Sequence, residues 1–167
     1  MSGDVSFDVV SDFDEQELRN ALDQVQREIG QRYDFKGSKA SIEFDEKEST
    51  LTLVADDAFK LNALWEIVQT RLVRRNVPVR NLTRGEVQAA ANSTVRQDIS
   101  LQQGIPSEKA KDIVKFLKDA KLKKVQATIQ GDQLRVTSPS KDDLQDAMRA
   151  LREHDFGVPL QFTNFRD

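Results

Sequence analysis

The chain repeats its own pattern of apolar residues, and this repeat restricts the fold more than any other feature of the sequence. The alternating residues Phe7 and Val9 match Ile99 and Leu101 in the second half. Two helical patterns recur, each with its internal spacing unchanged. Leu18, Ala21, Leu22 and Val25 match Ala110, Ile113, Val114 and Leu117. Leu61, Leu64, Trp65 and Val68 match Leu144, Ala147, Met148 and Leu151. Because order and register also agree, the sequence indicates a duplicated unit.

The residue pattern of each half predicts a strand, a helix, a β-hairpin, a second helix and a closing strand. Alternating apolar residues predict the strands, and apolar residues three and four apart predict the helices. Asp14 is suited to cap the first helix, and Pro78 marks the end of the second. This order is the β-α-β-β-α-β plan of the ferredoxin-like fold. We therefore expect an α+β chain of two ferredoxin-like units, at residues 1–85 and 86–167, with Trp65 buried.

Composition excludes several classes of protein. The net charge is −3, from 25 basic and 28 acidic residues, so the chain as a whole is not attracted to nucleic acid or membranes. Cysteine is absent, which excludes disulfides and suits a reducing compartment. The acidic N-terminal stretch has no apolar signal-peptide core, and no segment approaches the ~20 apolar residues of a membrane span. We expect a soluble, cytoplasmic protein without membrane contact.

The sequence offers few groups for catalysis. His154 is the single histidine, and it follows a polar helical pattern. A positive charge at that place would interact favourably with the C-terminal end of the helix dipole. One histidine without cysteine cannot assemble a Ser-His-Asp triad or a usual zinc site. The phosphate-binding loops GxxxxGKS/T and GxGxxG are absent. We therefore expect no enzyme, no metal site and no cofactor.

The open face of each predicted sheet is polar. Alternation assigns these residues to it: Ser41, Glu43, Thr50, Thr52, Gln126, Thr128, Arg135, Thr137, Gln161 and Thr163. None is aromatic, whereas RNA-recognition modules of the same plan stack bases on aromatic rings of the sheet. We do not expect that mode of RNA binding.

Four segments carry a resemblance to a known family. The stretches "SFDVVSDFD", "RYDFKGS", "IQGDQLRVTSPSKDDLQ" and "PLQFTNFRD" resemble, in this order, the signatures of the YajQ-like family of bacterial proteins. In that family arginine is commoner at the position of Lys141. The resemblance implies two ferredoxin-like domains that exchange their first strands, so the strand near Phe7 would join the second unit. It also implies nucleotide binding, with ATP, GTP, tRNA and cyclic di-GMP among the suggested ligands.

The first half of the chain holds two candidate binding segments. In "YDFKG", Tyr33 and Phe35 are expected to pack at a helix-to-strand corner, Gly37 to take a positive φ, and Lys36 to project from the corner. In "RLVRRNVPVRNLTR", five arginines occur without an acidic residue between them. They can hold phosphates, with Arg80 just past a helix end. Alternatively, their role is structural, because the negative C-terminal end of the helix dipole stabilises cations.

The second half adds candidates on three elements. Arg135 falls on the predicted open face. Ser138 or Ser140 can cap the last helix, where Lys141 would support an anion bound to free backbone N–H groups, unless the cap is purely structural. Phe165 and Arg166 can clamp a purine between a ring and a guanidinium, or belong to a strand that closes the core.

These observations favour a non-enzymatic nucleotide-binding protein. The expected ligand is cyclic di-GMP, GTP or ATP, and binding would act through a regulatory protein partner. The alternatives are a tRNA- or RNA-binding accessory protein and a protein-interaction scaffold. The predicted nucleotide-binding residues are Lys36, Gly37, Arg80, Arg135, Ser138, Lys141, Phe165 and Arg166. Phosphate would be held chiefly by Lys36, Arg80, Arg135 and Arg166.

Overall fold

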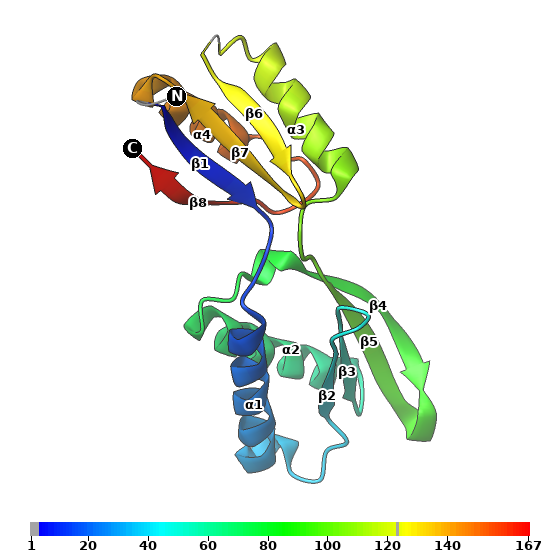
Figure 1. Cartoon of the computed structure of the whole chain (residues 1–167). Coiled ribbons are helices and arrows are strands. Elements are labelled where there is room, and N and C mark those ends of the chain that lie inside the picture. The colour runs from blue at the N-terminus through cyan, green and yellow to red at the C-terminus, as the bar shows by residue number, and fades with distance from the viewer. Residues whose placement is uncertain (1–3, 123) are drawn as a thin grey trace. The chain divides into compact units, whose positions relative to one another are not determined.

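The computed structural model describes residues 4–122 and 124–167, which form two compact units (Figure 1). The central unit is the continuous segment Phe13–Gln102. The split unit joins the described residues up to Asp12 with Gln103–Asp167. Each unit is a four-stranded antiparallel sheet with two α-helices. Among the described residues, no helix is both long and apolar enough to cross a membrane.

The central unit has the sheet order β2-β3-β5-β4. Its helices and strands are α1 (Glu15–Gln31), β2 (Ser41–Asp45), β3 (Thr50–Ala55), α2 (Ala58–Arg74), β4 (Leu82–Ala90) and β5 (Thr94–Leu101). Short 3₁₀ turns lie at Tyr33–Phe35, Val79–Asn81 and Ala91–Ser93. As expected, Asp14 caps α1, because its carboxylate accepts a hydrogen bond from Glu17 N at 3.2 Å.

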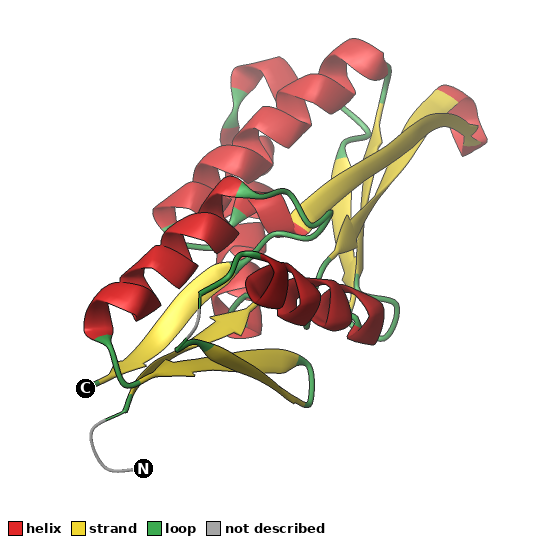
Figure 2. Ribbon diagram, turned by 90° about the horizontal axis from the view of Figure 1, so that it is seen from above, coloured by secondary structure: helices red, strands yellow, loops and turns green. Residues whose placement is uncertain are grey.

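The split unit has the sheet order β6-β7-β1-β8. Its helices and strands are β1 (Val5–Val10), α3 (Ser107–Asp119), β6 (Gln126–Gln130), β7 (Gln133–Ser138), α4 (Lys141–Glu153) and β8 (Gln161–Arg166). In both units the helices lie against one face of the sheet, which leaves the other face open (Figure 2).

The two halves of the chain exchange their first strands. β1 comes from the first half but pairs with β7 and β8 of the second, with Phe7 opposite Val136. β5 is the first strand of the second half, and it pairs with β3 and β4 of the first, with Ile99 opposite Leu51. Each sheet is therefore a complete ferredoxin-like sheet with one strand from the other half, and the predicted fold is confirmed.

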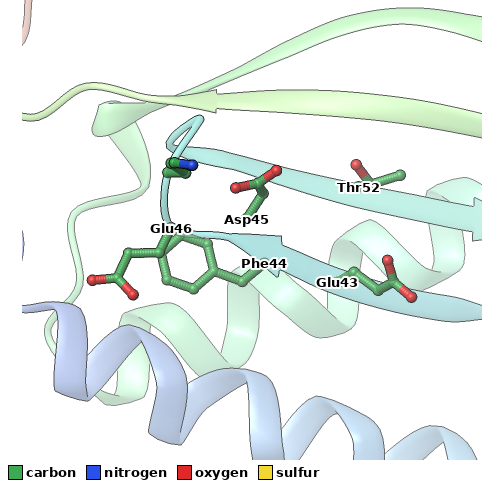
Figure 3. A pocket seen from close by; sticks show the side chains of 6 residues that line it. Glu43, Phe44, Asp45, Glu46 and Thr52 are labelled. Atoms are coloured by element: carbon green, nitrogen blue, oxygen red, sulfur yellow. The ribbon is translucent and has the colours of Figure 1, made fainter.

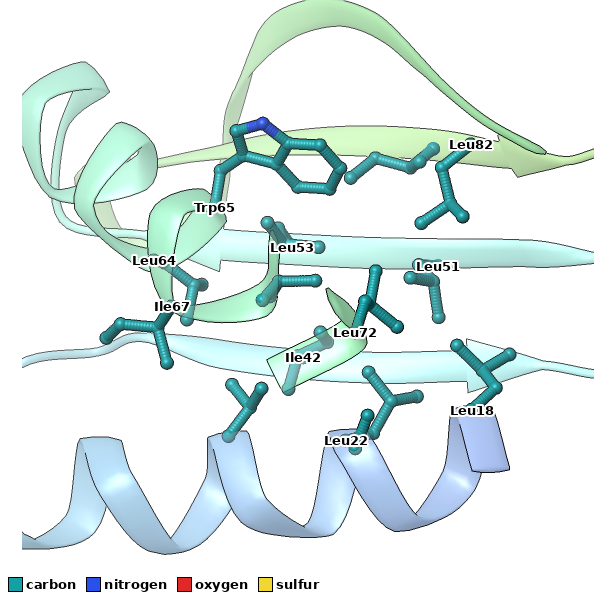
Figure 4. Close-up of a cluster of buried hydrophobic side chains, with 14 of the residues drawn as sticks. Leu18, Leu22, Ile42, Leu51, Leu53, Leu64, Trp65, Ile67, Leu72 and Leu82 are labelled. Atoms are coloured by element: carbon teal, nitrogen blue, oxygen red, sulfur yellow. The ribbon is translucent and has the colours of Figure 1, made fainter. Parts of the chain in front are cut away.

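The core of the central unit is built by the apolar faces that the helical and alternating patterns predict. Leu18 and Leu22 of α1 meet Leu64 and Leu72 of α2 over strands β2, β3 and β5 (Figure 4). Trp65 is buried at 7% exposure, as expected, and the Arg84 guanidinium lies 5.1 Å from the centre of its ring. The buried faces of α1 and α2 are thus the ones that the helical spacing of the sequence predicts.

The core of the split unit depends on the exchanged strand. Phe7 and Val9 of β1 are fully buried there against Leu134 and Val136 of β7. The ring of Phe7 contacts Phe162 of β8 edge-on, at 5.7 Å between ring centres. Because β1 supplies central apolar side chains of this core, the split unit needs this strand from the first half of the chain for its stability.

The corner after α1 differs in part from the expectation. Phe35 is buried and Gly37 has a φ of 73°, as predicted. Tyr33, however, is 89% exposed, so its predicted packing is wrong. The physical reason is that α1 ends at Gln31 and the chain continues as a 3₁₀ turn with about three residues per turn. This change of period rotates Tyr33 away from the apolar stripe of α1.

Candidate functional site

A buried carboxylate organises a cluster of two guanidiniums, one amide and one hydroxyl on the open face of the split unit. Asp8 of β1 accepts hydrogen bonds from Arg135 Nε at 3.1 Å and from Asn164 Nδ2 at 2.8 Å. Arg166 Nη2 lies 3.6 Å from the same carboxylate, and its Nη1 donates to Ser6 Oγ at 3.3 Å. We call Ser6, Asp8, Arg135, Asn164 and Arg166 the Asp8 cluster.

Strand register and one bulge bring this cluster together. Asp8 lies directly opposite Arg135 on β7 and Thr163 on β8, so their side chains share the face opposite Phe7. The register between β1 and β8 shifts between Ser6 and Asp8, and Asn164 takes a φ of 60° at the irregularity. This bulge re-aims the strand, as bulges commonly do. It allows Asn164 and Arg166 to reach the same carboxylate.

The electrostatics of the Asp8 cluster leave a positive surplus. Asp8 is only 5% exposed, and burial is the largest influence on its carboxyl, acting to raise the pKa. Hydrogen bonds from Asn164 and Arg135 and the charges of Arg135 and Arg166 outweigh it, so the pKa of Asp8 lies below its usual value. Two guanidiniums share one carboxylate, and both remain partly open to solvent. An anion bound on this face would contact guanidiniums that Asp8 already holds in place.

Near the start of α4, Ser138 and Lys141 differ in how far their side chains are exposed to solvent. Ser140 caps α4, because its Oγ accepts a hydrogen bond from Asp143 N at 3.2 Å. Ser138 is buried beneath this cap, and its Oγ accepts from Ser140 N at 3.0 Å. Lys141 is exposed and its Nζ lies 4.0 Å from Asp167. Of the two predicted residues, Lys141 is the one whose side chain is open to solvent.

Phe165 and Arg166 point to opposite faces of β8. The Phe165 ring lies on the core side, 6.0 Å from the ring of Phe7, whereas Arg166 reaches the Asp8 cluster on the open face. A hollow of about 30 Å³ is lined by both residues together with Lys141. This volume corresponds to about one water molecule. The clamp of ring and guanidinium on one purine stays a prediction.

The other three predicted residues belong to the central unit. Lys36 and Gly37 lie at the corner after α1, and Arg80 lies in the 3₁₀ turn before β4. The side chains of Lys36 and Arg80 are exposed, and within residues 4–122 and 124–167 neither makes an ion pair or a side-chain hydrogen bond. Five predicted residues thus lie in the split unit and three in the central unit.

A hollow on the sheet of the central unit is unsuited to phosphate. It measures about 740 Å³ and lies along the β2–β3 hairpin (Figure 3). Its lining includes the carboxylates of Glu43, Asp45 and Glu46, with Lys47 as the one cation. Three carboxylates close together repel an anion, because like charges at short range raise the free energy of binding. Size alone therefore does not mark the phosphate site.

Sequence reasoning missed Asp8 and Asn164. The alternation in "DVSFDVV" places Asp8 on the face opposite Phe7 and Val9. That signal identifies a charged residue on the open face, but its partner Arg135 is 127 residues away in the chain. His154, by contrast, packs its ring against Phe116 at 4.6 Å and Phe156 at 4.5 Å, and is part of an aromatic cluster.

The fold and the Asp8 cluster define a class: a protein of two strand-exchanged ferredoxin-like units with cations fixed on an open sheet face. The model of the family described as "Nucleotide-binding protein YajQ-like" matches residues 5–166, and the chain belongs to that family.

Curated relatives match the chain along nearly its whole length. A protein of Acidithiobacillus ferrooxidans named "Nucleotide-binding protein" is 54% identical over 162 residues, which cover 97% of this chain and 99% of that protein. A protein of Solibacter usitatus with the same name is 50% identical over 163 residues, 98% of each chain. One of Chloroherpeton thalassium, named likewise, is 48% identical over 166 residues, 99% of this chain and 100% of that protein.

Proposed function

We propose that the chain binds a nucleotide without turning it over, and that the Asp8 cluster on the open face of the split unit holds the phosphates. The observation that carries this proposal is the sharing of one buried carboxylate by two guanidiniums, Arg135 and Arg166. Asp8 fixes the two cations, and the pair retains one positive charge more than Asp8 neutralises. Guanidiniums form charge-assisted hydrogen bonds to phosphate oxygens, about twice as strong as neutral ones. The names of the relatives support the same ligand class.

The neighbouring residues support phosphate recognition rather than base stacking. The register places Thr128 and Thr137 beside Arg135 and Ser6 on the same face. Their hydroxyls can donate to phosphate oxygens or to a sugar. Lys141, at the start of α4, adds an exposed cation nearby on the chain. The ligand we propose is cyclic di-GMP or a mononucleotide, GTP or ATP, whose phosphates match a site with few cations.

A titration with fluorescent cyclic di-GMP, GTP and ATP tests the proposal. Arg135→Gln and Arg166→Gln should each weaken binding by roughly ten- to a hundredfold, because each removes a charge-assisted hydrogen bond of about 1.5–3 kcal/mol. Arg149→Gln is the matched control, since Arg149 is exposed on α4 and, in the part of the chain that the structure describes, pairs only with Asp146 one turn away. Equal affinity of all three variants and the native protein would place the nucleotide elsewhere.

The dependence on salt separates a nucleotide from RNA. A site with two or three phosphate contacts loses little affinity between 50 and 200 mM salt, whereas an RNA that follows many cations loses several orders of magnitude. A steep slope with tRNA, together with weak binding of every mononucleotide, would favour the RNA-binding alternative. Failure of both ligands to bind would favour a protein-interaction scaffold. We further propose that the protein works in the cytoplasm and that a partner protein reads the bound state.

A further inference from the structure

A second group of arginines surrounds a hollow on the helical side of the central unit. The hollow measures about 230 Å³ and lies where the end of α1 meets α2. Its lining consists of Gln24, Arg27, Glu28, Gln31, Arg32 and Arg71. These residues come from two helices that pack side by side and from the residue that follows α1. The hollow lies in a different unit from the Asp8 cluster.

Glu28 fixes two of these arginines in place. Its Oε1 accepts from Arg71 Nε at 3.0 Å and Nη2 at 2.9 Å, and its Oε2 accepts from Arg32 Nη1 at 3.1 Å. Burial acts to raise the pKa of Glu28, but these bonds and charges lower it overall, so the carboxylate stays ionised. Arg32 is held on its other side by Asp34, at 3.0 and 2.8 Å. The guanidiniums are therefore ordered before any ligand arrives.

Of the three arginines that line the hollow, Arg27 is the one without an ion-pair partner among the described residues. Across the described ranges 4–122 and 124–167, its side chain has no ion pair and no hydrogen bond, not even with Asp23 one turn earlier on α1. Three guanidiniums at the hollow outnumber the two carboxylates that contact them, Glu28 and Asp34. One positive charge thus remains beside the amide side chains of Gln24 and Gln31.

We propose that this hollow is an anion site that takes a phosphate or diphosphate group. The planar fork of a guanidinium can donate two parallel hydrogen bonds to two oxygens of a tetrahedral phosphate. The volume is below the 300–1,000 Å³ typical of sites for whole drug-sized ligands, which limits the bound part to a small group. Arginines that served only the dipole of a helix end would need neither a shared carboxylate nor a hollow between two helices.

The test is a titration of the ¹⁵N-labelled full chain with sodium pyrophosphate, followed by NMR at constant ionic strength, with sodium chloride as reference. Saturable shifts are expected for the backbone amides of Arg27, Glu28 and Arg71. Arg27→Gln should raise the dissociation constant about tenfold, which corresponds to one charge-assisted contact partly exposed to water. Because the side chain of Arg27 is exposed and has no partner among the described residues, its replacement should leave the fold unchanged.

Two further variants keep the test sharp. Arg74→Gln is the matched control: Arg74 lies on the same helix as Arg71, is exposed and is outside the hollow, so the dissociation constant should change less than twofold. Arg166→Gln should leave these shifts unchanged, which separates this site from the Asp8 cluster. Shifts that equal those with chloride, unchanged affinity of Arg27→Gln, or an equal loss in Arg74→Gln would each overturn the proposal.

The source of the phosphate group is settled by comparing ligands. ADP carries the diphosphate on a nucleoside, and adenosine carries none. If ADP shifts the same amides and adenosine does not, the site accepts the diphosphate of a nucleotide. If pyrophosphate alone shifts them, the site accepts the free anion.

Discussion

Asp8 and Arg135 lie 127 residues apart in the chain and directly opposite each other on adjacent antiparallel strands, with Arg135 Nε donating to Asp8 Oδ1 at 3.1 Å. The pair spans the exchange of strands, because β1 comes from the first half of the chain and β7 from the second. The contact therefore ties the stability of the split unit to the position of the candidate phosphate-binding cation.

Replacing Asp8 should destabilise the split unit. Asp8→Asn removes the charge that holds Arg135 and Arg166, and a hydrogen bond to a charged group contributes about 1.5–3 kcal/mol. Both arginines are partly exposed, at 35% and 41%, so water compensates some of the loss and about 1–2 kcal/mol is expected. Urea unfolding followed by circular dichroism measures it. A change below about 0.3 kcal/mol would mean that the cluster does not stabilise the unit.

The loss in Asp8→Asn should depend on pH. The pKa of Asp8 in the folded protein lies below 3.8, so the unfolded chain takes up the proton more readily. The stabilisation by Asp8 is therefore complete above about pH 5 and is lost as the pH falls through the folded value. The difference in unfolding free energy between the native protein and Asp8→Asn should shrink from pH 7 to pH 3. A constant difference over that range would contradict the lowered pKa.

Trp65 should be one of the most sensitive positions in the central unit. Its ring is 7% exposed within the core of α2 and the sheet, so Trp65→Ala should cost about 3–5 kcal/mol through lost burial and the cavity left behind. Phe59 is the control, since it lies on the same helix but is 80% exposed. Phe59→Ala should change the unfolding free energy by less than about 0.5 kcal/mol. Similar losses in both variants would show that the helix phase is wrong.

Two glycines should respond to alanine in opposite directions. A Cβ at Gly85 in β4 would lie 2.8 Å from the backbone oxygen of Asp98, so Gly85→Ala should cost about 1–3 kcal/mol. Gly30 lies in α1, where an added Cβ would meet open space, and Gly30→Ala should stabilise by about 0.5–1 kcal/mol. Thermal unfolding of both variants decides. Destabilisation by Gly30→Ala would mean that α1 frays before this residue.

The protein should leave its nucleotides intact. The single histidine packs between two phenylalanine rings rather than among polar groups. The cations of the Asp8 cluster can bind a phosphate but cannot accept a proton from an attacking water, because arginine stays protonated. Incubation with ATP, GTP and cyclic di-GMP, with and without Mg²⁺, followed by chromatography should recover the starting nucleotide. Hydrolysis that persists after rigorous purification and disappears in a single carboxylate variant would contradict this expectation.

The sequence by itself determined the elements and their buried faces. Helical spacing identified Leu18, Leu22 and Trp65 as core residues, alternation identified Phe7 and Val9, and residue type identified the cap at Asp14 and the positive φ at Gly37. These features follow from interactions within a few residues, such as backbone geometry, capping and the period of each element. They are recorded locally, so a single sequence is enough to find them.

Only the tertiary structure decided which element meets which. The pattern of β1 fits either sheet, because alternation records that one face is buried but not which strands lie beside it. The exchange of strands therefore had to come from the family resemblance and from the observed pairing. The same limit applies to the sites: Asp8 with Arg135 and Arg166, and Glu28 with Arg71, are contacts between residues far apart in the chain. Long-range packing creates such contacts, and no periodicity within either segment encodes the partner.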